Sequence, residues 1–176
     1  PLDGVYIDRN KDGLITQQDK YRFHKPAADV FYGFNTSVTY KNFDMGMNWR
    51  GSWGNYNYNN VDSSKGSFNN ILIRNTDLSN GVENLLETGF RSNDTKRFES
   101  DYYIQDASFI RLDNVSVGYT FNQKENSTSL VKLTLSAQNV LVITKYEGLD
   151  PEISGGIDGN LYPRPITFTL GLNVNF

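Results

Sequence analysis

The residues most able to do chemistry lie close together near the N-terminus, in the twelve-residue segment DRNKDGLITQQD. Four of its residues have side-chain oxygens at positions one, three, five and twelve: Asp8, Asn10, Asp12 and Asp19. Gly13 at position six permits a sharp turn, and Leu14 at position seven could offer its backbone carbonyl. Oxygen ligands at this spacing are typical of the EF-hand loop. The segment therefore predicts a calcium site.

Two features separate this segment from a complete EF-hand. The last ligand position holds Asp19 instead of the usual Glu, and we expect the shorter carboxylate to bind through one oxygen or to tighten the loop. The flanking residues Val5 to Ile7 and Tyr21 to Phe23 do not have a helical pattern. We therefore expect a calcium loop without the paired helices. The alternative is a metal-free loop held by side-chain-to-backbone turns.

Catalytic chemistry has little support in the sequence. His24 is the only histidine, it stands beside Lys25-Pro26, and no G-x-S-x-G nucleophile motif is present. A zinc site built from one histidine and no cysteine is improbable. The Gly155-Gly156 pair lacks the strand-to-helix context of a phosphate-binding loop. We expect the protein not to be an enzyme.

Five segments alternate between apolar and polar residues with a period of two, which predicts β-strands. These strands would position the side chains of any site. Their ranges are residues 30–40, 43–53, 109–121, 130–140 and 166–176. In the second, for example, Phe43, Met45 and Met47 alternate with Asp44 and Gly46. In the third segment the phase slips by one residue near Asp113-Asn114, and a β-bulge would explain the slip.

Strand length favours a membrane barrel over a soluble sheet. Each segment has roughly ten residues, the length that a tilted transmembrane strand needs, whereas soluble strands more often have about five or six. The connections also alternate between short and long, as barrel turns and extracellular loops do. The short ones are 41–42 and 122–129, and the long ones are 54–108 and 141–165. We therefore predict that the short turns and the C-terminus are periplasmic and that residues 1–29 and both long loops are extracellular.

Composition agrees with an all-β chain. Hydrophobic residues make up 38%, aromatic residues 14%, and no run approaches the roughly 20 apolar residues of a spanning helix. The net charge is -3 and the basic residues form no stripe, so nucleic-acid binding has no support. Five strands cannot close a membrane barrel, which needs at least about eight, so we expect further strands outside this chain. The chain begins at Pro1 without a signal peptide, which also suggests a longer precursor.

Several stretches together resemble the C-terminal end of the SusC/RagA family of TonB-linked outer-membrane transporters, which is typical of Bacteroidetes. The stretches are DRNKDGLITQQD, ASFIRLDNVSVGYTF from Ala107, LSAQNVLVITKYEGLDPEI from Leu135 and YPRPITFTLGLNVNF from Tyr162. Their order and spacing match the family over nearly the whole chain, except for residues 55–106.

The resemblance implies that the chain supplies the last five strands of a large antiparallel transmembrane β-barrel, 22-stranded in the family, with an N-terminal plug. It also implies an outer-membrane location, a SusD-like surface lipoprotein as partner, and import of oligosaccharides or peptides driven by TonB. On the same analogy, the terminal Phe176 is the signal that the barrel assembly machinery reads, and the alternative is that it is one more interfacial aromatic.

Two other classes remain open. The chain could be a soluble calcium-binding β-sandwich that recognises glycans, or part of an outer-membrane barrel enzyme, although no nucleophile and base are apparent. If it is a transporter wall, the polar side chains Asp44, Asn48, Arg50 and Gln138 face the lumen and could touch the substrate, although an ordinary wall role is the simpler reading.

Overall fold

The computed structural model describes residues 6–68, 71–73, 77–88, 100–122 and 130–175. The chain divides into two compact units, which are described separately. Unit 1 contains residues 1–27, 55–107 and 146–162, and unit 2 contains residues 28–54, 108–145 and 163–176. The calcium loop predicted from the sequence lies in unit 1, and all five predicted strands lie in unit 2.

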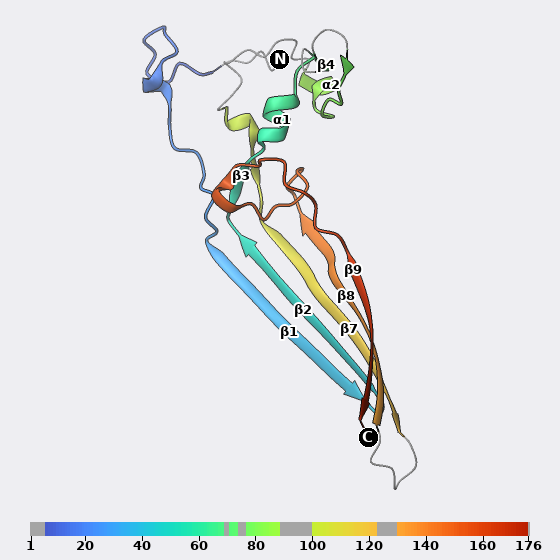
Figure 1. Cartoon of the computed structure of the whole chain (residues 1–176). Helices are drawn as coiled ribbons and strands as arrows, with labels where there is room; N and C mark the ends of the chain where they lie inside the picture. The colour runs from blue at the N-terminus through green and yellow to red at the C-terminus, as the bar shows by residue number, and fades with distance from the viewer. Residues whose placement is uncertain (1–5, 69–70, 74–76, 89–99, 123–129, 176) are drawn as a thin grey trace. The chain divides into compact units, whose positions relative to one another are not determined.

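Unit 2 is a single five-stranded antiparallel sheet in the order β1-β2-β7-β8-β9 (Figure 1). The strands are β1 (Val30–Tyr40), β2 (Phe43–Trp53), β7 (Phe109–Asn122), β8 (Leu130–Thr144) and β9 (Thr167–Asn175). The expected end of β8 at residue 140 is wrong, because Leu141 and Ile143 continue the pairing with β7. β9 starts one residue later than expected, and Phe176 lies outside the described residues.

One face of the sheet is apolar across all strands. The register places Val38 beside Met45, Met45 beside Val117, and Val117 beside Leu135, which in turn pairs with Leu170. Leu170 is 70% exposed and most apolar side chains of this face are open, so no second layer of unit 2 covers it within the described residues. Soluble sheets normally bury such a face, and an exposed stripe of this size marks contact with another apolar phase or partner.

A bulge at Asp113 explains the phase slip in β7. Asn48 pairs with Asn114 and Trp49 with Leu112, so Asp113 is skipped on the β2 side. On the other side it also lacks a partner, because the pairing with β8 passes from Asn114 directly to Leu112. The bulge returns Leu112 to the apolar face, as the sequence predicted.

The predicted tight turn at Lys41-Asn42 joins β1 to β2. Lys41 has a positive φ of 53°, and the backbone N–H of Thr120 donates to the carbonyl of Asn42, whose side chain donates to the carbonyl of Thr120. Aromatic rings gather at this end: Phe43 and Tyr119 meet edge to face with centroids 4.7 Å apart. A ring cluster at one strand end matches the interfacial aromatics of membrane barrels.

The described residues of unit 1 form only short elements. They are 3-10 helices η1 (Gln17–Asp19), η4 (Asp101–Tyr103) and η5 (Ser154–Gly156), helices α1 (Asn60–Lys65) and α2 (Leu85–Thr88), and strands β3 (Tyr56–Tyr58), β4 (Leu72–Ile73), β5 (Asp77–Leu78) and β6 (Ile104–Asp106). The segment between β2 and β7, expected as a plain loop, therefore contains small elements. None of the described helices has the length and hydropathy to span a membrane.

Asparagines hold the centre of unit 1 together. Asn55, Asn57 and Asn59 alternate along the chain and are 7%, 1% and 1% exposed. The side chain of Asn57 donates to the carbonyl of Pro151 at 2.7 Å, and that of Asn55 donates to the carbonyl of Ala107 at 2.9 Å. A buried amide must find partners, so these bonds tie β3 and the residue before it to two segments distant in sequence.

Candidate functional site

The polar face of the sheet carries a row of side chains that crosses all five strands. Its members, which we call the amide row, are Asn35, Asn48, Asn114, Gln138 and Thr167, each paired with the next in the register. Four of the five are amides, and Asn35, Asn48, Gln138 and Thr167 are exposed. Since directly paired residues share a face, the register alone brings these groups together.

A second row of small residues lies next to the amide row, toward the β1–β2 turn. Its members, the hydroxyl row, are Ser37, Gly46, Ser116, Ser136 and Thr169. An ideal Cβ at Gly46 would lie 3.1 Å from the Ser116 Oγ, so the Ser116 hydroxyl occupies the space beside Gly46. The amide side chains therefore stand beside a strip of short hydroxyl groups.

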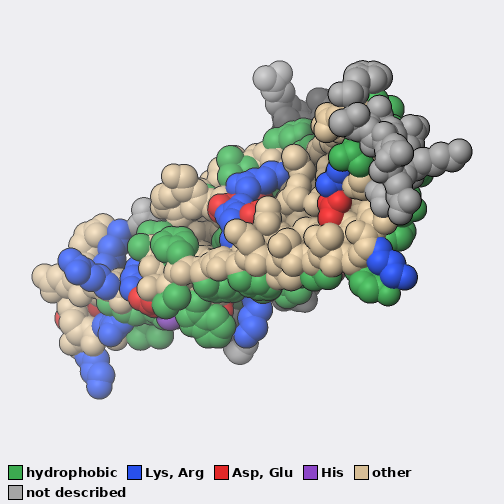
Figure 2. Space-filling model, turned by 90° about the horizontal axis from the view of Figure 1, so that it is seen from below, with side chains coloured by type: hydrophobic (Ala, Val, Ile, Leu, Met, Phe, Trp, Pro, Cys, Tyr) green, Lys and Arg blue, Asp and Glu red, His purple; other side chains and the backbone are tan. Residues whose placement is uncertain are grey.

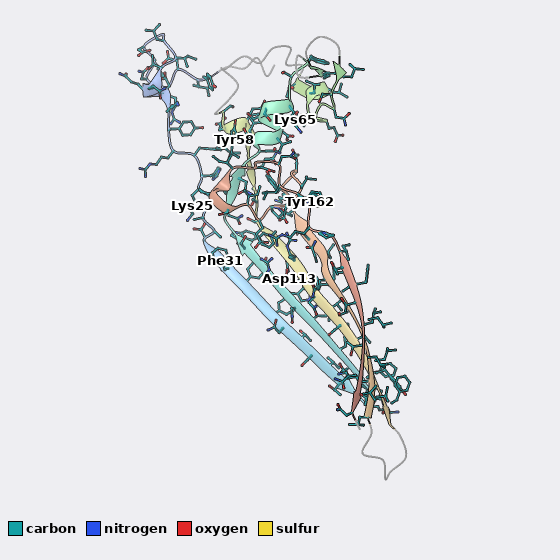
Figure 3. The ribbon with its side chains drawn as sticks, in the orientation of Figure 1. Lys25, Phe31, Tyr58, Lys65, Asp113 and Tyr162 are labelled. Carbon is teal, nitrogen blue, oxygen red and sulfur yellow. The ribbon has the colours of Figure 1, made fainter. Side chains whose placement is uncertain are left out.

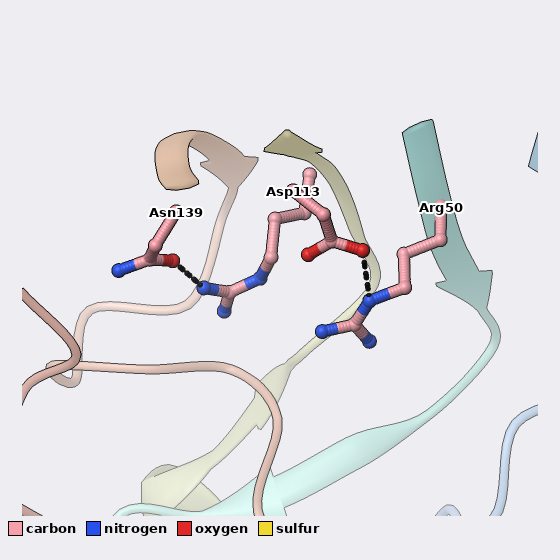
Figure 4. A network of polar contacts seen from close by, with 4 residues as sticks. Arg50, Asp113 and Asn139 are labelled. Atoms are coloured by element: carbon pink, nitrogen blue, oxygen red, sulfur yellow. Dashed lines mark hydrogen bonds and ion pairs between the residues drawn. The ribbon is translucent and has the colours of Figure 1, made fainter. Parts of the chain in front are cut away.

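Charged groups flank the amide row on its other side, where β2 and β7 place Arg50 directly across from Arg111. Arg50 donates from Nε to the carboxylate of Asp113, and Arg111, only 2% exposed, donates to Oδ1 of Asn139 at 2.6 Å (Figure 4). Two arginines face to face would repel each other. The bulge relieves this by directing the Asp113 carboxylate toward Arg50; Figure 3 labels Asp113 near the start of β7.

Asn139 connects this network to the start of β9. It has a positive φ of 54°, and its Nδ2 donates to the carbonyl of Arg164 at 2.6 Å and to that of Pro165 at 3.4 Å. Pro163 and Pro165 have no N–H to donate to a strand ladder. The side chain of Asn139 thus replaces backbone pairing at the point where β9 leaves β8.

A separate ion pair lies on the polar face nearer the β1–β2 turn. Lys132 on β8 reaches across β7 to Asp44 on β2, with 2.7 Å between Nζ and Oδ1. The residue of β7 beneath the pair is Gly118, and an ideal Cβ there would lie 2.5 Å from the Asp44 Oδ1. The absence of a side chain at Gly118 therefore makes room for the ion pair.

The lumen-facing residues expected from the sequence separate into two groups. Asp44 and Arg50 are committed to ion pairs within the sheet, whereas Asn48 and Gln138 belong to the same row through Asn114. Asn35, Asn114 and Thr167 were not predicted as site residues from the alternation along single strands. Pairing the five alternating segments in register would have found them, because they are the polar partners of Asn48 and Gln138.

The acidic loop of unit 1 is folded by its own side chains. Asp8 accepts hydrogen bonds from the backbone N–H groups of Lys11 and Gly13, at 2.7 and 2.8 Å, and Asp12 accepts from Leu14 at 2.8 Å. Gly13 has a φ of 83°, as a sharp turn at that position requires. The chain path is that of a tight Asx-rich loop, and its last three residues form the 3-10 turn η1.

Asp19 closes the loop from its far end. Its Oδ2 accepts from the backbone N–H of Thr16 at 2.7 Å, and its Oδ1 accepts from Arg9 at 2.9 Å and Asn10 at 3.4 Å. The Thr16 N–H lowers the pKa of this carboxyl below its usual value, and desolvation opposes that shift. Asp19 is 8% exposed, so its charge is held by backbone dipoles.

The loop fits a cation only in part. Asn10 and Asp12 are exposed and Asp8 is half-buried, and Ca²⁺ readily accepts amide and carbonyl oxygens besides carboxylates. However, no group of three or more His, Asp or Glu side chains able to hold a metal occurs among the described residues. A calcium ion would therefore depend on Asn10 and the Leu14 carbonyl as well as on the carboxylates.

The segment after the loop is fixed by aromatic contacts. Arg9 lies 3.8 Å over the ring of Tyr21, whose hydroxyl donates to Asp101, and this bond raises the pKa of Tyr21. His24 stacks on Tyr56 with centroids 3.7 Å apart. His24 therefore has a packing contact with an aromatic ring.

Acidic groups also meet in unit 1. The hydroxyl of Tyr146 donates to Oδ2 of Asp158 at 2.7 Å in a buried position. Burial raises the pKa of Tyr146, and the hydrogen bond and charge of Asp158 act in the same direction. Burial likewise raises the pKa of Asp62, and the negative charges of Glu147 and Asp158 add to that effect. Figure 2 shows acidic and basic side chains lying side by side at several places on the face seen there.

Comparison with known proteins defines the class: the chain corresponds to part of a TonB-dependent receptor. It is 38% identical over 181 residues to the TonB-dependent receptor SusC of Bacteroides thetaiotaomicron, which covers 100% of this chain and 18% of SusC. It is 30% identical over 191 residues to the TonB-dependent receptor P3 of Formosa agariphila, covering 98% of this chain and 19% of that protein. No family model matches the chain.

Solved structures agree with the fold. The RagAB peptide importer in its closed-closed state matches with a TM-score of 0.71 and 21% identity, over 93% of this chain and 19% of that one. The open-open state of the same importer gives a TM-score of 0.69. The all-β barrel prediction is therefore confirmed, and the chain belongs to the SusC/RagA-type TonB-dependent receptors. It spans about a fifth of the length of the relatives that it matches.

Proposed function

We propose that this chain forms part of the wall of an outer-membrane nutrient transporter that is driven by TonB. The observation that carries the proposal is the sheet of unit 2. Its strands have 9 to 15 residues, one of its faces is apolar and exposed, and the other is polar. Lipid outside and an aqueous or plugged lumen inside are the surroundings that such a sheet requires.

A SusD-like surface lipoprotein is the partner we propose, and oligosaccharides or peptides are the cargo. The support is membership of the SusC-type family and the likeness to an importer described as transporting peptides. Deleting the gene should abolish growth on one class of polymer, and an affinity-tagged transporter should co-purify with an acylated lipoprotein. Growth on every polymer tested, together with purification of the transporter alone, would reject both parts.

The soluble rival, a calcium-binding β-sandwich that recognises glycans, would need a second sheet over the apolar face. Unit 2 has one sheet, and the other sheets among the described residues have two strands each. We expect the isolated chain to aggregate in water without detergent, because its apolar stripe would be exposed. A monodisperse, detergent-free monomer that unfolds cooperatively would support the soluble reading instead.

We propose that the segments at the β2–β7 and β8–β9 connections, and the residues before β1, are extracellular, and that the C-terminus is periplasmic. The antiparallel topology supports this, since all three segments leave the sheet at the strand ends opposite the Lys41-Asn42 turn. An engineered Cys at Ser79 should react with an impermeant label on whole cells. Reaction only after permeabilisation would reverse the topology.

Calcium binding by the loop from Asp8 to Asp19 remains a proposal, with Asp8, Asn10, Asp12, Leu14 and Asp19 as ligands. The ion would supply no chemistry of its own and would fix the loop in one conformation. In the intact protein, calcium should protect the loop from proteolysis, and Asp8→Asn should abolish that protection while Asp3→Asn retains it. Equal proteolysis with calcium and with a chelator would show that the loop is held by its turns alone.

Phe176 is proposed as an assembly signal. It follows β9, whose apolar residues alternate toward the same face, and a terminal strand exposes its edge until the barrel closes. Deleting Phe176 from the full-length protein should lower the amount of heat-modifiable barrel in the outer membrane. Equal amounts and unchanged assembly kinetics would show that Phe176 is an ordinary interfacial aromatic.

A further inference from the structure

We propose that the amide row is a contact site for an uncharged oligosaccharide during its passage along the wall. The inference rests on the proposed transport function and assigns residues to it: Asn35, Asn48, Asn114, Gln138 and Thr167. It is distinct from the ion pairs of the same face, which the sheet satisfies internally.

The amide row has hydrogen-bonding capacity that the rest of the described sheet does not use. No side-chain hydrogen bond joins any of its members to another described residue. The neighbouring charged groups differ: Asp44 is paired with Lys132, and Arg50 with Asp113. The polar face therefore presents amide and hydroxyl groups to which a ligand can bind, while the charged groups nearby are already paired.

The chemistry of these groups selects an uncharged, polar ligand. An Asn or Gln side chain provides two donors and an acceptor, and each Ser or Thr hydroxyl can both donate and accept. Sugar hydroxyls have the same dual character, so each can satisfy an amide whichever way it turns. A carboxylate ligand would leave the amide oxygens of the row without donors.

The spacing of the row favours a sugar chain over an extended peptide. Neighbouring strands lie about 4.8 Å apart, so five side chains in register span roughly 19 Å across the wall. An extended peptide repeats about every 3.3 Å and would fall out of step with the row. A hexose unit in an extended oligosaccharide has a repeat close to the strand spacing and can remain in step. The adjacent hydroxyl row has short side chains and adds further hydroxyl donors and acceptors beside the amides.

The test removes the amides while preserving their size, in the intact transporter on whole cells. The variant combines Asn48→Leu, Asn114→Leu and Gln138→Met. The matched control combines Thr39→Val and Thr134→Val, which removes polarity from the same face two rows away. Uptake of tritiated α-1,4-gluco-, β-1,4-xylo- and β-1,3-gluco-oligosaccharides gives KM and maximal rate for each, and heat-modifiability gives the amount of folded barrel.

We expect the KM for the imported oligosaccharide to rise roughly fivefold for each amide that is lost, with the control unchanged. An unchanged KM in the folded triple variant would overturn the inference, as would an equal loss in the control. Altered protease access to the plug with unchanged KM would assign the row to a plug contact and overturn it too. If the unmodified transporter imports none of the oligosaccharides, the proposed cargo is wrong. If it imports one of them, the variants test the role of the amide row alone.

Discussion

Gly118 gives the sharpest test of how the polar face is built, through its closeness to an ion pair. An ideal Cβ on Gly118 would lie 2.5 and 2.7 Å from the two carboxylate oxygens of Asp44. Real Cβ contacts do not reach such distances, so Gly118→Ala must push the carboxylate away from Lys132, now at 2.7 Å. Gly171 lies in the same row, and a Cβ there would meet nothing closer than the Thr134 carbonyl at 3.9 Å. It is the matched control.

The expected loss of folding stability follows from one stabilising and two destabilising contributions. Replacing a strand glycine by alanine stabilises by about 0.5–1 kcal/mol through backbone entropy, and Gly171→Ala should show that gain. Gly118→Ala loses an ion pair that is only about two-thirds buried, worth about 0.2–1 kcal/mol, and forces the Asp44 side chain off its rotamer at a cost of about 0.5–1.5 kcal/mol. Gly118→Ala should therefore be about 1–2 kcal/mol less stable than Gly171→Ala.

Urea unfolding of the purified intact barrel, followed by tryptophan fluorescence, measures both variants. The same pair is then made in an Asp44→Ser background, where the carboxylate is gone and the difference should shrink to within about 0.5 kcal/mol. A difference that persists without Asp44 would show that Gly118 is needed for some other reason. Equal stability of the two alanine variants would refute the close contact itself.

Three further outcomes are expected. Asn139→Ala should cost about 1–3 kcal/mol, since buried Arg111 loses an acceptor, while Asn35→Ala stays within about 0.5 kcal/mol; equal urea midpoints would contradict this. Asn57→Ala should speed hydrogen exchange in residues 146–162, because its bond to the Pro151 carbonyl is lost, and unchanged exchange would count against that tether. The pKa of Asp62 is raised in the folded state, so the contribution of Asp62 to folding stability is favourable at low pH and is lost as the pH rises above the usual pKa of an aspartate. Asp62→Asn should therefore stabilise the protein at neutral pH, and this gain should vanish near about pH 4. A gain that is independent of pH would refute the electrostatic cause.

The fold of unit 2 was largely predictable because period-two alternation determines both the strand and its face. It located the strands and also the bulge, since only an inserted residue reconciles Leu112 with Val115. The end of β8 was missed because Asn139 and Val140 interrupt the alternation, and only the structure shows the pairing resuming at Leu141.

Unit 1 was less predictable because buried polar residues hold it together, and no periodic signal identifies them. Asn57 and Asn59 read as an ordinary polar loop, although both are almost fully buried. Alternation along each strand predicted which residues of the candidate site face the lumen. Which of these residues form ion pairs depends on the strand register and on the length of the side chains, and neither follows from alternation. Arg50 was indistinguishable from Asn48 until the bulge placed Asp113 beside it.

The tether at Asn139 has a mechanical consequence for the wall. At the level of the amide row the sheet is five strands wide, but at Ile143 the register includes only β1, β2, β7 and β8. Bending stiffness in a sheet depends on hydrogen bonds to both neighbours, and beyond Gln138 the side chain of Asn139, in place of a strand ladder, joins β8 to the segment before β9. Compliance is therefore concentrated beside the two prolines, and a lateral load on the wall would be relieved there first.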